Sequence, residues 1–157
     1  MKTFLPDEPA QVSVLRALTL LAVLAALCAP LLPWMVYRLP DGGLVPLAPL
    51  LFWAGPAASA LPGSCLRCLN LLALCCAAGS ALLAGVGISL FTLRRTEPLL
   101  SFLCCGFWLL VLPAGGALLA PLLAEPGLFR PQWPCFAALL AGLAGAFLSA
   151  RYRRFAE

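Results

Sequence analysis

The sequence contains no histidine, and charged residues make up only 10% of it. Ordinary globular domains carry about 25% charged residues. The absence of histidine excludes an imidazole general base, a Ser-His-Asp or Cys-His pair, and histidine ligation of haem or zinc. Apolar residues make up 63% of the chain, and the mean hydropathy is +1.02. A water-soluble fold cannot bury so much hydrocarbon, so we expect a polytopic integral membrane protein.

Long apolar stretches predict an all-α fold, a four-helix transmembrane bundle that forms one domain over residues 1–157. The expected helices cover residues 14–36, 65–93, 99–124 and 134–150. The first stretch follows Lys2 and Arg16, as the apolar core of a secretory signal would. Its leading segment is long and acidic, however, and we expect this helix to remain in the protein.

Residues 40–63 form an outer, proline-rich segment that is apolar but unsuited to a regular helix. Pro46, Pro49, Pro56 and Pro62 each remove a backbone donor. Bare backbone cannot face lipid, so we expect an interfacial or re-entrant segment. A short fifth span is the alternative.

The basic residues predict an orientation with both termini in the cytoplasm, in a bacterial-type inner or plasma membrane. With four spans the inner side carries Lys2, Arg16, Arg94, Arg95, Arg151, Arg153 and Arg154, and the outer side carries Arg38, Arg67 and Arg130. This distribution marks segment ends and gives no support for nucleic-acid binding. The arginines of the tail can also hold anionic lipid headgroups.

Four aromatic residues are expected to act as interfacial anchors at the outer boundary: Trp34, Tyr37, Trp53 and Trp133. Amphipathic rings of this kind prefer the level of the lipid headgroups.

Small residues recur at every fourth position along two of the expected helices. The second helix carries Ala73, Ala77, Ala81, Gly85 and Ser89, and the fourth carries Ala138, Gly142, Ala146 and Ala150. Each row lies on one helix face and lets another backbone approach closely. We therefore predict two helix-packing interfaces. Whether the rows meet inside one bundle or receive a foreign helix stays open.

Eight cysteines are present, four of them between Cys65 and Cys76. Their spacing along a helix does not offer the tetrahedral geometry of a metal site. A Cys-x-x-Cys pair at the outer start of the second of four helices resembles the quinone-linked, disulfide-generating membrane proteins of the DsbB type. That resemblance implies a thiol-disulfide relay through Cys65 and Cys68 to a quinone. Members also carry a second pair between the third and fourth helices, where this chain has Cys135 alone.

Two other interpretations of the cysteines stay open. Cysteine can serve as a small packing group in an apolar core. Alternatively, Cys65 and Cys68, or either of them with Cys135, form a structural disulfide if the outer side is oxidising. Four helices with Trp53 ahead of two cysteines are also faintly similar to claudin-type tetraspans. We do not adopt that likeness, because the first outer loop lacks the length and the polar alternating strands of such proteins.

No expected span carries Asp, Glu, Lys or Arg near its centre, where pumps and coupled transporters place their working charges. We therefore expect a non-catalytic accessory or scaffold subunit that needs no cofactor. Its expected partners are membrane lipids and other integral membrane subunits, or a second copy of itself. The alternatives are the quinone-linked oxidoreductase and a carrier of an apolar or lipid ligand, which would use a kink between Pro113 and Gly116.

Overall fold

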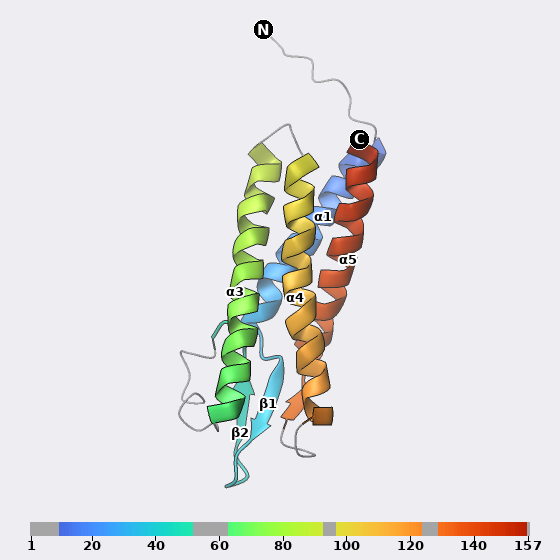
Figure 1. Ribbon diagram of the computed structural model, residues 1–157. Helices are drawn as coiled ribbons and strands as arrows, with labels where there is room; N and C mark the ends of the chain where they lie inside the picture. Colours follow the sequence, from blue (N-terminus) through green and yellow to red (C-terminus); the bar gives the residue numbers. More distant parts are fainter. Residues whose placement is uncertain (1–9, 52–62, 93–96, 124–128, 157) are drawn as a thin grey trace.

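The protein is described by a computed structural model that covers residues 10–51, 63–92, 97–123 and 129–156 (Figure 1). Some side chains at helix ends, that of Cys65 among them, lie outside the description. The helices are α1 (Ala10–Cys28), α3 (Gly63–Thr92), α4 (Glu97–Leu123) and α5 (Trp133–Ala156), with a 3-10 turn η1 (Ala29–Leu31) after α1. The strands are β1 (Met35–Arg38), β2 (Leu44–Leu47) and β3 (Phe129–Pro131).

The described residues include four helices that are long and apolar enough to cross a membrane, as predicted, and the chain is a membrane-embedded helical bundle. Stretches long and apolar enough to cross a bilayer run over Ser13–Leu31, Leu66–Ser89, Leu99–Leu122 and Trp133–Arg154. The start of α1 and the end of α5 lie at one end of the bundle, and the strands lie at the other (Figure 1).

The first helix is shorter than predicted, because it ends at Cys28 instead of near residue 36. Pro30 follows at once in the 3-10 turn and, with Pro33, opposes continuation of the α-helix. From Met35 the chain runs as a strand. Ala29, Pro30, Trp34 and Met35 are buried against protein, whereas Leu31 and Leu32 are exposed, so hydropathy alone does not show where the membrane-spanning part of this stretch ends.

A three-stranded antiparallel sheet in the order β2-β1-β3 closes this end of the bundle. The first outer loop forms the β1–β2 hairpin, which was not predicted from the sequence; its strands are four residues each and mostly apolar. Tyr37 in the central strand pairs with Val45 on one side and with Phe129 on the other. The hairpin turns at Gly42, whose φ of 87° suits glycine. Residues 52–62 of the proline-rich segment lie outside the described residues, so its interfacial, re-entrant or spanning character stays a prediction.

Helix α4 lies between α3 and α5 and packs extensively against both. Helix α1 crosses behind α4, mainly against α5, and touches α3 over a smaller area (Figure 1). At the α3–α4 crossing the backbones come close, because a Cβ atom on Gly79 would lie 3.1 Å from the carbonyl oxygen of Gly106. The core of the bundle includes Leu83, Leu103, Phe107 and Leu110. The open side of the bundle is the one between α1 and α3.

Candidate functional site

The small-residue row of α5 lies inside the bundle, against α4. Ala138, Gly142 and Ala146 are buried, and only Ala150 at the end of the row is exposed. A Cβ atom on Gly142 would lie 2.6 Å from Val111 Cγ2. Over Ala138, Gly142 and Ala146 this row therefore brings α4 and α5 together and is not available to another molecule.

The small-residue row of α3 faces away from the bundle over most of its length. Ala73 is buried, whereas Ala77, Ala81 and Gly85 are exposed. A Cβ atom on Gly85 would meet no atom within 4 Å. Ser89, which is half-buried, donates its hydroxyl to the Gly85 carbonyl oxygen at 2.8 Å. We call Ala77, Ala81 and Gly85 the outer row of α3.

A shallow apolar groove of about 200 Å³ runs beside the outer row, between α1 and α3. It is lined by Leu20, Val23, Leu24 and Leu27 of α1 and by Leu83, Ala84, Gly87 and Ile88 of α3. The helices touch where a Cβ atom on Gly87 would lie 3.3 Å from Val23 Cγ1. Residues separated by three, four or seven positions share a helix face. Ala77, Ala81, Ala84 and Ile88 therefore form one surface that joins the outer row to the groove.

Two of the expected interfacial anchors are buried in the protein instead of facing headgroups. Trp34 is 1% exposed and donates its indole N–H to the Ala29 carbonyl oxygen at 2.8 Å. Tyr37 is 4% exposed, and its ring centroid lies 5.3 Å from that of Phe129. Both corrections have one physical cause, because the sheet folds these side chains onto the helix ends. Trp133 is 70% exposed, as an anchor requires, and Trp53 lies outside the described residues.

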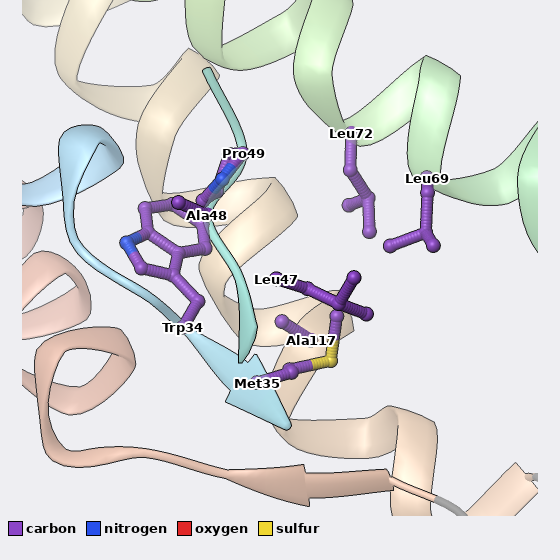
Figure 2. A pocket seen from close by; sticks show the side chains of 8 residues that line it. All are labelled: Trp34, Met35, Leu47, Ala48, Pro49, Leu69, Leu72 and Ala117. Atoms are coloured by element: carbon purple, nitrogen blue, oxygen red, sulfur yellow. The ribbon is translucent and has the colours of Figure 1, made fainter. Parts of the chain in front are cut away.

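The junction between sheet and helices is tightly closed. Figure 2 shows the side chains around its small cavity, which are Trp34, Met35, Leu47, Ala48, Pro49, Leu69, Leu72 and Ala117. The cavity measures about 10 Å³, which is room for one water molecule at most. Sites for small organic ligands ordinarily occupy about 300–1,000 Å³.

Helix α4 also continues unbroken through Pro113 and Pro121. Neither feature supports a carrier that uses this cavity or a broken helix.

The cysteines whose side chains are described carry free thiols and are spread over four helices. Cys76 and Cys135 are buried, and the Cys135 thiol donates to the Ala114 carbonyl oxygen at 3.3 Å across the α4–α5 contact. Cys68 is exposed on the first turns of α3. Within the described part of the chain no three Cys, Asp or Glu residues gather as a metal site would require. The packing interpretation thus fits Cys76 and Cys135, while the Cys65–Cys68 pair is described only at Cys68.

Two polar atoms on α3 are buried without a hydrogen-bond partner among the described residues. They are Asn70 Oδ1 and Ser80 Oγ. Unsatisfied groups of this kind cost free energy, so each is a position where α3 lacks a hydrogen bond among the described residues.

Comparison of the chain with protein-family models, with curated proteins and with solved structures finds no match in any of the three.

Proposed function

We propose that this protein is a non-catalytic accessory or scaffold subunit of a membrane assembly. In this proposal the outer row of α3, with the adjoining α1–α3 groove, receives one transmembrane helix of another integral membrane protein. The observation that carries the proposal is the contrast between the two small-residue rows. The α5 row is used by α4, whereas Ala77, Ala81 and Gly85 are exposed.

A helix fits this surface better than fluid lipid does. Helix association in a bilayer depends on close packing, and small side chains let two backbones approach. Other exposed helix positions carry large apolar side chains, such as Leu112 on α4 and Leu140 and Phe147 on α5, beside single small residues such as Ala144. Those side chains offer lipid tails a large contact area. The small side chains of the outer row offer a disordered acyl chain little contact area. They form a flat surface against which a rigid helix can pack closely.

The groove favours a single helix that contacts α1 and α3 together. Leu24 of α1 and Ile88 of α3 stand exposed at the groove, on either side of its open face. From Ala77 to Gly85 the row is about 12 Å long by helical rise. That length matches the crossing region of two helices, where only two or three turns are in contact.

The proposed orientation has both termini in the cytoplasm of a bacterial-type inner membrane. Arg151, Arg153 and Arg154 lie at the end of α5 away from the sheet, and an excess of arginine marks the cytoplasmic side of membrane proteins.

Site-specific photo-cross-linking in native membranes tests the proposal. A photoreactive residue replaces Ala81 in one variant and, as a matched control, the exposed Ala144 of α5 in another. We expect a discrete adduct with one other membrane protein at position 81 and none at 144. An adduct only with a second copy, or equal adducts at both positions, contradicts the proposal.

A further inference from the structure

A second cleft opens at the end of the bundle away from the sheet, between the start of α4 and the end of α5. Its volume is about 350 Å³. Ser101 of α4 and Arg153 and Arg154 of α5 supply its polar wall, and Leu100, Cys104 and Ala150 supply its apolar wall. Arg153 Nη1 donates to Ser101 Oγ at 3.3 Å, which joins the two helices across the cleft.

We propose that this cleft binds the phosphate of an anionic phospholipid, with the start of an acyl chain on its apolar wall. This inference does not depend on the proposed docking of a helix at α3. Guanidinium groups present planar, bidentate donors that match phosphate oxygens, and the Ser101 hydroxyl adds a further donor. Arg153 and Arg154 lie in the last turn of a membrane-spanning helix, which is the level of lipid headgroups.

The composition of the cleft favours a lipid over a free anion. A soluble phosphate uses only polar donors, whereas Leu100, Cys104 and Ala150 give this cleft an apolar wall as well. Leu100 is buried and Cys104 is half-buried, so the apolar wall leads from the arginines toward the interior of the bundle. In a phospholipid the charged phosphate is followed by the acyl chains. The phosphate can therefore contact the arginines while the start of an acyl chain contacts the apolar wall.

Arg151 provides a matched control within the same helix turn. It does not line this cleft but faces a neighbouring hollow, shared with Phe147, Ala150 and Arg154. Replacing Arg151 or Arg154 by glutamine removes the same charge from nearly the same depth. A general attraction between the tail and an anionic membrane predicts that the two substitutions lower lipid affinity equally. A specific cleft predicts that Arg154→Gln lowers it more than Arg151→Gln.

Native mass spectrometry of the full chain measures the binding directly. The protein is taken up in mild detergent and titrated with phosphatidylglycerol or with phosphatidylcholine, and inorganic phosphate serves as the soluble probe. We expect one tightly bound phosphatidylglycerol per chain. Loss of one direct hydrogen bond between charged groups lowers an affinity about tenfold or more, so Arg154→Gln is expected to weaken binding about tenfold. Arg151→Gln changes the affinity less than twofold.

A variant that alters the space and not the charge completes the test. Ser101→Phe fills the cleft from an exposed position of α4, and it is expected to displace the bound lipid while the net charge stays the same. Equal weakening by Arg151→Gln and Arg154→Gln, or unchanged binding in Ser101→Phe, overturns the proposal. Displacement of the lipid by millimolar phosphate also overturns it, because the site is then one for a soluble anion.

Discussion

The ring of Phe107 on α4 lies directly against the backbone of Gly145 on α5, in the space that a side chain at position 145 would occupy. Phe107 is fully buried, so its ring cannot swing out into the surroundings of the bundle. With Gly142 against Val111, this contact fixes how closely the two helices pack. The α4–α5 pair is thus the part of the bundle that depends most strictly on small residues.

Gly145→Ala is expected to lower the free energy of unfolding by about 1–3 kcal/mol, the usual cost of overpacking a core. Alanine improves helix propensity by about 0.5–1 kcal/mol, which is too little to offset the clash. Gly85→Ala is the matched control, because a Cβ atom there meets nothing within 4 Å. Equilibrium unfolding in mixed micelles measures both. Equal stabilities of the two variants contradict the α4–α5 packing described above.

Trp34 is expected to stabilise the sheet end of the bundle and not to act as a lipid anchor. Trp34→Phe removes the donor to Ala29 and costs about 0.5–1.5 kcal/mol of unfolding free energy. Trp34→Ala also leaves a cavity and costs about 3–5 kcal/mol. Trp133→Ala, at an exposed position, serves as the control and changes the stability little. A larger loss for Trp133→Ala than for Trp34→Ala refutes this role.

The reactivity of the thiols toward a water-soluble reagent is expected to follow their burial. In native membranes a water-soluble, mass-tagging maleimide reacts with Cys68 without prior reduction, whereas Cys76 and Cys135 react only after denaturation. The variants Cys65→Ser and Cys68→Ser assign the tags. If Cys68 reacts only after a reductant is added, it is oxidised in the membrane. That result would favour a disulfide at Cys68, either the quinone-linked relay or a structural bridge, over a packing role for this thiol.

Much of the helical fold could be predicted from the sequence, because a run of about 20 apolar residues has few other stable outcomes. The sheet could not. Its strands are three or four residues long, and strand β2 and helices α3 and α4 lie between β1 and β3 in the chain, so their pairing exists only in the folded protein. Pro46 and Pro131 stand inside strands and weaken the local signal further.

The small-residue rows show a second limit of sequence analysis. Both faces of α3 carry such residues, Ala73 and Gly79 on the buried side and Ala81 and Gly85 on the exposed side. Four-residue spacing identifies a face but not its neighbour. Likewise, the tail arginines were visible as a charge cluster, whereas the contact between Arg153 and Ser101 joins residues of two different helices. Only the arrangement of the helices brings these groups together.

Co-purification tests the central claim about α3 most directly. The wild-type chain and the variants Ala81→Leu and Ala144→Leu are isolated in mild detergent, and quantitative mass spectrometry identifies the bound membrane proteins. Both substitutions add the same bulk at an exposed alanine. The account predicts one partner that is retained by wild type and by Ala144→Leu and reduced at least tenfold in Ala81→Leu, about 1.4 kcal/mol of binding free energy. A lone monomer in all three preparations, or equal recovery of the partner with Ala81→Leu, would contradict it.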